Sequence, residues 1–179
     1  MSEQAGRYQR STSGLVGALI VTLVVIGGFV AFRALNREKL EIRPEPVDYL
    51  GSVRYIEEAG DSVAYPPTLP KGWICTTAHY APGRDPEWDL GTLTSSGKFV
   101  GLREEDASVD ELVHSLVDEN AAEGAPVHLD SSIAPEWRTF TDSGGDYAVV
   151  VERADETLIV YGSAGEQEIR DFAASLVSK

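Results

Sequence analysis

The sequence contains three histidines and one cysteine, the residue types that most often act as metal ligands or nucleophiles. His79, His114 and His128 have no second histidine, cysteine or glutamate at a metal-ligand spacing such as that of a His-Glu-x-x-His run. Cys75 lies four residues before His79 on a predicted strand, and that separation spans about 13 Å, too far for both side chains to bind one metal ion. The sequence therefore predicts no metal-binding residue and no catalytic histidine.

Nucleophilic catalysis by Cys75 would need a neighbouring base and a positively charged setting that stabilises the thiolate. The chain has 29 Asp and Glu against 15 Lys and Arg, so its surroundings favour the protonated thiol. No serine lies in a Gly-x-Ser-x-Gly motif, and no glycine-rich segment has the pattern of a phosphate-binding loop. We expect a buried, unreactive Cys75, no catalytic residue, no cofactor-binding residue and no cofactor.

Acidic residues gather in short runs, notably Glu104-Glu105-Asp106, Asp110-Glu111 and Asp118-Glu119. A calcium-binding loop would place oxygen ligands at alternating positions around a central glycine. Neither these runs nor residues 142–146 follow that pattern. Charge runs of this kind usually keep a protein surface soluble, and we interpret them in that way.

Five large aromatic residues are distributed at about one per predicted strand. They are Trp73, Tyr80, Trp88, Trp137 and Tyr147. They could line a groove for a glycan or a peptide, but one aromatic residue per strand is also how an ordinary core is filled. Core packing is the favoured interpretation.

The distal part of the chain is strongly acidic. Residues 44–179 contain nine Lys and Arg against 26 Asp and Glu, which gives a net charge of −17. Nucleic acids and anionic lipid headgroups are bound mostly by lysine and arginine. The charge therefore excludes nucleic acid as an expected partner.

Residues 14–32 form an uncharged run of 19 residues. As a helix, the run would be about 28 Å long, close to the thickness of a bilayer's hydrocarbon core. The following residues Ala31-Phe32-Arg33-Ala34 lack the cleavage site of a secretory signal peptide, which is the main alternative. The sequence predicts a short basic tail over residues 1–13 and an uncleaved transmembrane helix over residues 14–32, with the lipid bilayer as its partner. Lysine and arginine on both sides leave the sidedness open.

Residues 33–46 read as a polar linker that ends in Pro44-Glu45-Pro46, a stiff and extended joint. The folded domain is expected over residues 47–179. Its 133 residues are enough to bury one core without disulfides or metals. The single cysteine agrees, since it leaves no intramolecular disulfide.

The first half of this domain predicts a helix over residues 48–59, a short apolar piece over 62–65, and strands over 73–80, 87–94 and 98–103. A second helix follows, with Ser108 as its N-cap and Glu111 three residues later. Its apolar positions are Val109, Leu112, Val113 and Leu116.

The second half repeats this order. Strands are predicted over residues 137–141, 147–152 and 157–161, and the closing helix is marked by Ile169, Phe172, Ala173 and Leu176. We therefore expect an α+β fold in which an antiparallel sheet has its helices packed on one face. Two strand-strand-strand-helix halves are one interpretation, although sequence identity between the halves is low.

The order of these parts resembles a domain of unknown function that is found in actinobacterial proteins with one N-terminal membrane helix. The resemblance rests on three features: the basic N-terminus with its apolar run, the entry Pro-Pro-x-Leu-Pro-x-Gly-Trp at residues 66–73, and the final strand, strand and helix over residues 147–177. It implies a cytoplasmic N-terminus at the plasma membrane and a C-terminal domain outside the cytoplasm. It implies no reaction and no catalytic residues.

Two functions remain open from the sequence. The preferred one is a noncatalytic, membrane-anchored domain that binds or supports a cell-envelope component, either a protein or a glycan. The alternative is a small anchored hydrolase whose carboxylates or histidines converge in the fold without a sequence signature. A cleft with two titratable side chains in mutual reach would favour the hydrolase, and an apolar surface patch would favour the binding domain.

Overall fold

The computed structural model describes residues 12–35, 44–154 and 156–178, and the chain divides into two units, one ending at Arg43 and one running from Pro44 to Lys179. In its described residues, the first unit consists of one helix, α1 (Thr12–Leu35). Most of the expected tail over residues 1–13 and of the expected linker over residues 33–46 lies outside the described residues. The remaining helices and strands belong to the second unit.

The predicted transmembrane helix over residues 14–32 is corrected by the structure. These residues lie within α1, but no helix among the described residues is both long and apolar enough to cross a membrane. The prediction rested on the length of the run and on its lack of charged residues.

The second unit begins with α2 (Tyr49–Ala59), where the sequence predicted a helix. The Gly51 amide donates a hydrogen bond of 3.0 Å to the carboxylate of Asp48, which caps the N-terminus. Gly60 ends the helix at φ 94°, a left-handed conformation that glycine adopts without strain. The buried side of the helix is formed by Tyr49, Val53 and Ile56.

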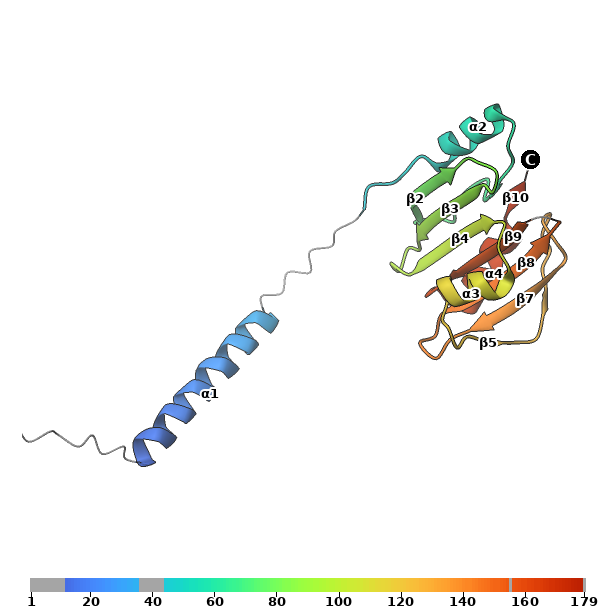
Figure 1. Cartoon of the computed structure of the whole chain (residues 1–179). Helices are drawn as coiled ribbons and strands as arrows, with labels where there is room; N and C mark the ends of the chain where they lie inside the picture. The colour runs from blue at the N-terminus through green and yellow to red at the C-terminus, as the bar shows by residue number, and fades with distance from the viewer. Residues whose placement is uncertain (1–11, 36–43, 155, 179) are drawn as a thin grey trace, which may run out of the picture. The chain divides into compact units, whose positions relative to one another are not determined.

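One eight-stranded antiparallel sheet organises this unit, and six of its strands are long (Figure 1). The first half supplies β2 (Ile74–Ala81), β3 (Glu87–Leu93) and β4 (Phe99–Glu105). The second half supplies β7 (Glu136–Thr141), β8 (Tyr147–Arg153) and β9 (Glu156–Gly162). The short strands β5 (Ala122–Glu123) and β6 (Val127–His128) both pair with β7.

The strand order is β2-β3-β4-β9-β8-β7-β5, so the last long strands of the two halves meet at the centre. There, β4 and β9 pair antiparallel with Leu102 opposite Val160 and Arg103 opposite Ile159. β2 forms the outer edge of the sheet.

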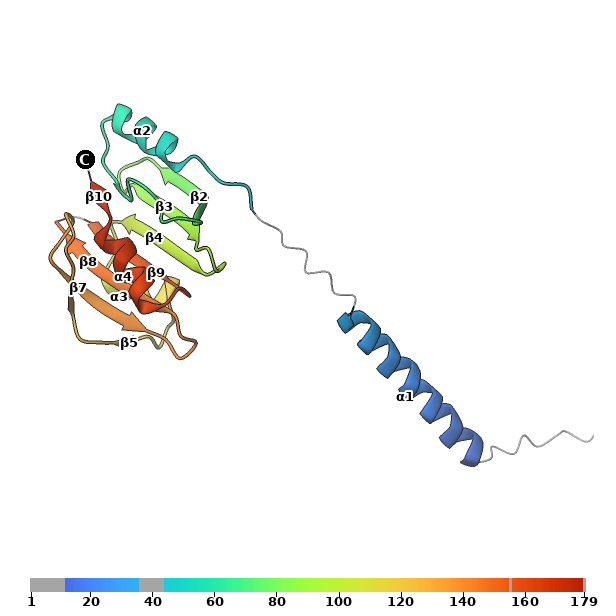
Figure 2. The ribbon, with the colours of Figure 1, turned by 180° about the vertical axis from the view of Figure 1, so that it is seen from behind.

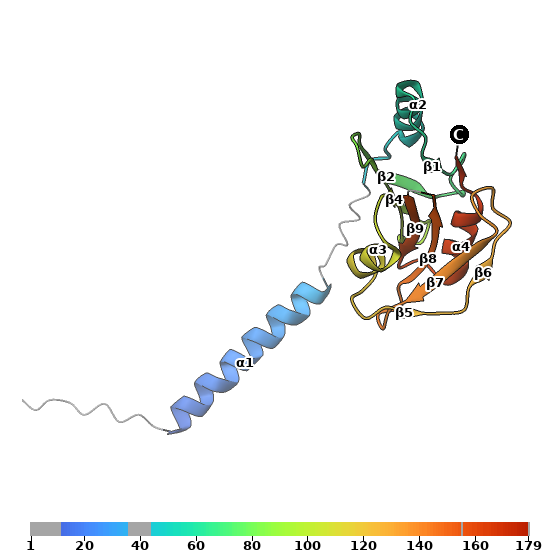
Figure 3. The same cartoon turned by 45° about the vertical axis from the view of Figure 1, so that its right-hand side comes forward.

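Two helices cover opposite faces of the sheet, which corrects the expectation that all helices pack on one face. In Figure 1, α3 (Val109–Leu116) lies in front of the sheet and α4 (Glu166–Ala174) lies behind it, and Figure 2 shows the reverse. Figure 3, which looks more nearly along the sheet, places them on its two sides. The reason is that β8 and β9 are buried on both faces, so each face needs a helix. The sheet-rich α+β class itself is confirmed.

The two faces carry separate cores. The larger core joins α2 and α4 to the face of the sheet that carries Leu102, Val149 and Val160, which we call the α4 face. The smaller core joins α3 to the face that carries Ala148, Val150 and Ile159, which we call the α3 face.

A two-stranded sheet closes the unit. It pairs β1 (Ala64–Tyr65), which follows α2, with β10 (Val177–Ser178) at the end of the chain. The hydroxyl groups of Ser62 and Ser178 share a hydrogen bond of 2.9 Å beside this pair. The segment between α2 and β2 is therefore held in place by the C-terminus.

Candidate functional site

Glu104 is a buried acidic residue on the α4 face, near the end of β4. Its side chain is 3% exposed, although its place in the acidic run of residues 104–106 predicted a surface position. Its cross-strand neighbours are Trp88 on β3 and Leu158 on β9, which are both buried. A carboxyl group in such surroundings loses its hydration and needs partners of its own.

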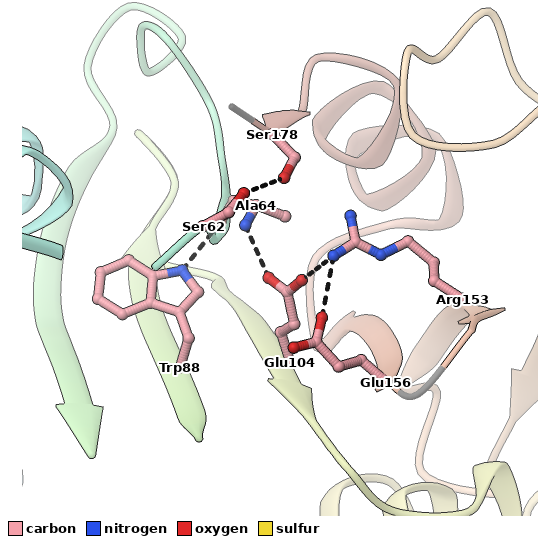
Figure 4. A network of polar contacts seen from close by, with 7 residues as sticks. All are labelled: Ser62, Ala64, Trp88, Glu104, Arg153, Glu156 and Ser178. Carbon is pink, nitrogen blue, oxygen red and sulfur yellow. Dashed lines mark hydrogen bonds and ion pairs between the residues drawn. The ribbon is translucent and has the colours of Figure 1, made fainter. Parts of the chain in front are cut away.

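The structure supplies those partners from two distant parts of the chain, β1 and the end of β8 (Figure 4). The amide of Ala64 donates a hydrogen bond of 2.7 Å to Glu104 Oε2. The guanidinium of Arg153, at the end of β8, donates from Nη2 to Glu104 Oε1. The same nitrogen donates to Glu156 Oε2 at 3.1 Å, so one arginine joins two carboxyl groups. We call Glu104, Arg153 and Glu156 the Glu104 cluster.

Burial raises the pKa of Glu104 to about 7, and this effect outweighs the Ala64 amide and the Arg153 charge, which both lower the pKa. The neighbouring carboxylate of Glu156 adds to the increase. A carboxyl group with a pKa near neutrality has the acidity that a general acid or base requires. Both of its oxygens are engaged, however, which favours a structural role for Glu104.

The segment before β1 is held against this cluster by further hydrogen bonds. The indole Nε1 of Trp88 donates to the Ala64 carbonyl oxygen at 2.9 Å. The hydroxyl of Tyr80, on β2, donates to Asp61 Oδ2 at 2.7 Å. Burial, together with the Asp61 carboxylate, raises the pKa of Tyr80 to about 12, so this hydroxyl keeps its proton at neutral pH. The segment is thus fixed at Asp61 and at Ala64.

A cavity of about 260 Å³ lies beside these contacts. Its walls include Asp61, Tyr80 and the three members of the Glu104 cluster. We call it the Glu104 pocket. It is polar and small, with room for one side chain or a small ion.

A larger hollow of about 540 Å³ lies between α2 and the edge strand β2. Tyr55, Ile56, Ala78 and Pro82 give it apolar walls, and Asp48 and Asp61 add two carboxylates. We call it the α2–β2 groove. Asp61 and Tyr80 line both this groove and the Glu104 pocket, so the two hollows adjoin.

Tyr55 is the most exposed large apolar residue of the second unit, at 73%. It lies on the outer side of α2, away from the buried positions of that helix. Exposed tyrosines of this kind are common at the centre of protein interfaces, because the ring supplies contact area and the hydroxyl can still bond to water or to a partner.

A second cluster of charged residues lies on the α3 face, around Arg103. Its guanidinium is 2.6 Å from Glu87 Oε1 and 2.5 Å from Asp89 Oδ2. The Glu105 carboxylate lies 3.6 Å away. These carboxylates offset the charge of a half-buried arginine on the strands of the first half.

The histidines singled out in the sequence do not come together. His79, His114 and His128 are all exposed, and His128 lies 3.5 Å from Glu136. Within residues 12–35, 44–154 and 156–178, no group of three His, Cys, Asp or Glu side chains could hold a metal ion.

Cys75 is 2% exposed, and its thiol donates to the Thr77 carbonyl oxygen at 3.2 Å. Burial raises the pKa of this thiol, which opposes the formation of a thiolate. Its buried position agrees with the expectation drawn from the sequence.

The aromatic residues divide between core and surface. Trp88, Trp137 and Tyr147 are buried. Trp73 stacks on Phe172 with ring centroids 5.9 Å apart. Of the five aromatics named from the sequence, Tyr80 is the one that lines the α2–β2 groove.

Sequence reasoning missed Tyr55 and the Glu104 cluster, although both left a signal. Tyr55 falls outside the apolar stripe of its helix, and this position predicts that its large ring is exposed. Glu104 follows Val100 and Leu102 at a spacing of two residues, which assigns its side chain to the core face.

Comparison with curated proteins finds no significant match. A family model described as a protein of unknown function, DUF4245, matches residues 7–176 and so covers both units of the chain almost completely. The chain therefore belongs to the DUF4245 family of proteins of unknown function.

Proposed function

We propose that residues 44–179 form a noncatalytic binding domain that attaches to another macromolecule through the α2–β2 groove. The observation that carries this proposal is the exposed ring of Tyr55 at the side of an apolar hollow of about 540 Å³. A concave apolar surface with a few polar groups is the usual form of a binding site, and the exposed ring of Tyr55 extends this surface.

The arrangement of the domain supports a binding role. The groove lies at the β2 edge of the sheet, whereas α3 and α4 pack on β8 and β9 at its centre. A partner can therefore contact α2 and β2 without disturbing the main core. The groove is also preformed, because Asp48 caps α2 and the Asp61–Tyr80 hydrogen bond fixes its far end.

The partner class and the location of the domain are predicted from the sequence and not from the groove. A cell-envelope protein or glycan, a location outside the cytoplasm and an actinobacterial source remain predictions from the sequence and its resemblance.

A small hydrolase is the second candidate, and one observation favours it. Glu104 has a pKa near neutrality in a pocket that also contains Asp61 and Glu156, which is a common setting for a catalytic carboxyl group. Against it, Glu104 Oε2 accepts the Ala64 amide and Oε1 accepts Arg153, so a substrate would have to displace one of them.

Complementation of a deletion strain separates the two candidates. Full-length Tyr55→Ala should fail to restore the deletion phenotype, while Glu104→Gln should restore it. Glu58→Ala is the matched control, because Glu58 is exposed on the same helix and does not line the groove. Cellular protein level and melting temperature are measured for each variant. Full complementation by Tyr55→Ala would refute the binding proposal, and loss of function in a normally stable Glu104→Gln would favour the hydrolase.

A further inference from the structure

We propose that the α2–β2 groove and the Glu104 pocket together receive a polypeptide segment in which a large apolar side chain stands next to a lysine or arginine. The apolar side chain would occupy the groove, and the cationic group would bind Asp61 at the entrance of the pocket. This inference rests on the proposed binding function and specifies its partner.

The first step is that the two hollows adjoin. Asp61 and Tyr80 line both of them, so a ligand that fills the groove meets Asp61 at the edge of the pocket. The groove supplies apolar contact through Tyr55, Ala78 and Pro82. The pocket supplies polar contact, and its smaller volume suits the end of one side chain.

The second step is the charge at the junction. Asp61 is exposed, and Tyr80 donates to its Oδ2. Among the hydrogen bonds of the described residues, none involves Asp61 Oδ1, so this oxygen can accept a bond from a ligand. The tyrosine hydroxyl remains protonated and therefore holds the carboxylate in one orientation.

The third step concerns the neighbouring charges. Arg153 is the cation of the pocket, and its Nη2 atom is shared between Glu104 and Glu156. Its charge is offset locally by these carboxyl groups. Asp48, at the other end of the groove, lies 3.8 Å from Arg54, and both side chains are mostly exposed, so this ion pair is weak. The combined surface favours a cationic ligand over an anionic one.

The charge of the whole domain acts in the same direction. A net charge of −17 over residues 44–179 attracts basic segments and repels acidic ones before contact. A neutral glycan would use the ring of Tyr55 but would gain nothing from this field or from a free carboxylate oxygen. A polypeptide with a basic residue uses both.

The test is selection of a random peptide library against the full-length protein, followed by affinity measurements on the enriched peptides. The expected peptides carry Phe, Tyr, Trp, Leu or Ile beside Lys or Arg. Replacing that basic residue with glutamine should weaken binding about tenfold, which is typical of a well-placed charge pair. Binding should also weaken several-fold between about 50 and 500 mM salt, because the charges are partly exposed.

Two protein variants remove charge while preserving the local hydrogen bonds. Asp61→Asn keeps an oxygen for the Tyr80 hydroxyl, and Asp48→Asn keeps an N-cap acceptor for α2. Asp61→Asn should lose about tenfold in affinity for the basic peptides, and Asp48→Asn should lose less. Asp85→Asn is the matched control, since Asp85 is exposed and lines neither hollow.

The possible failures are distinguishable. Enriched peptides that are neutral or acidic but still require Tyr55 would refute the basic partner and leave the binding function intact. Absence of any enriched peptide would refute the polypeptide partner; with a Tyr55→Ala variant that fails to complement, it would point to a glycan instead. Basic peptides that bind equally well to Tyr55→Ala and Asp61→Asn would refute the assignment of the site, and unchanged melting temperatures exclude unfolding as the cause.

Discussion

The two halves of the sheet have the same order of elements but bury their surfaces differently. Each half has three long strands and a helix, yet α3 and α4 lie on opposite faces. If the two halves were related by a twofold rotation that exchanged β4 with β9, both helices would lie on the same face of the sheet. Instead, α3 of the first half packs on β8 and β9 of the second half, the same two strands that α4 contacts from the other face.

This difference separates stability from recognition. In β8, the four residues Tyr147, Ala148, Val149 and Val150 are buried in succession, as expected for a strand that is covered on both faces. In β3 and β4, buried apolar residues alternate with the charged cluster around Arg103. Both halves contribute to the larger core, but the centre of the second half is buried on both faces. The first half also carries the Arg103 cluster, the α2–β2 groove and part of the lining of the Glu104 pocket.

The largest expected effect comes from the centre of the second half. Ile159 is completely buried beneath α3, and Ile159→Ala should lower the free energy of unfolding by about 2–5 kcal/mol. Urea unfolding of the full-length protein measures this loss. A loss below about 1 kcal/mol would show that α3 adds little to the core and would remove the contrast between the halves.

The second prediction concerns pH and the Glu104 cluster. Because the folded pKa of Glu104 is about 7, above its ordinary value of 4.5, its contribution to stability is fully present below pH 4.5 and is lost as the pH rises through 7. Glu104→Gln removes this dependence. The free energy of unfolding of the variant, relative to that of wild type, should therefore rise by about 1–3 kcal/mol between pH 4.5 and pH 8.

Urea unfolding at the two pH values measures that gain, and Glu58→Gln is the control because Glu58 is an exposed glutamate. If the difference in free energy of unfolding between variant and wild type were the same at both pH values, the raised pKa of Glu104 would be contradicted. The result also shows whether the junction of the two halves, where Arg153 reaches Glu104, depends on protonation.

A smaller effect is expected at Arg103, the cross-strand partner of Ile159 on the same face. Arg103→Met removes the cation and leaves three carboxylates close together. The free energy of unfolding should fall by about 1–2 kcal/mol at low salt. The decrease should be smaller at high salt, because salt screens the repulsion between the carboxylates. A loss as large as that of Ile159→Ala would mean that the two halves contribute equally to stability at this position.

The smallest effect is expected at the start of α3. The Glu111 amide donates to the Ser108 hydroxyl at 3.3 Å, and Ser108→Ala should cost about 0.5–1 kcal/mol, measured by thermal unfolding. Ser108→Asp is the control, because aspartate is also an N-cap residue and retains the acceptor. If alanine and aspartate behaved alike, the cap would contribute nothing to holding α3 on the second half.

Features set by local sequence were predictable. The end of α2 at Gly60 and the N-cap of α3 at Ser108 depend on neighbouring residues alone, and the period of two in the strands marks the long strands. The face on which each helix packs was not predictable in this way, because it depends on strands that are distant in sequence. The pairing of β1 with β10 was not predictable either, because the two strands are far apart in the sequence.

The candidate site combines both kinds of information. The alternation of Val100, Leu102 and Glu104 placed the glutamate on the core face, but its membership of an acidic run led to the opposite interpretation. Its partner Arg153 is 49 residues away and is brought to it by the pairing of β4 with β9 and of β9 with β8. Nothing local in the sequence connects the two residues.

The pairing of β1 with β10 also bears on the order of events during synthesis. Ala64 lies opposite Ser178, so residues that are translated long after Ala64 complete the segment that carries Asp61 and Ala64. Contacts between such distant positions form late in folding, and domains emerge from the ribosome with their N-terminal part first. The wall shared by the groove and the pocket can therefore reach its final form only after β10 has been synthesised and has paired with β1.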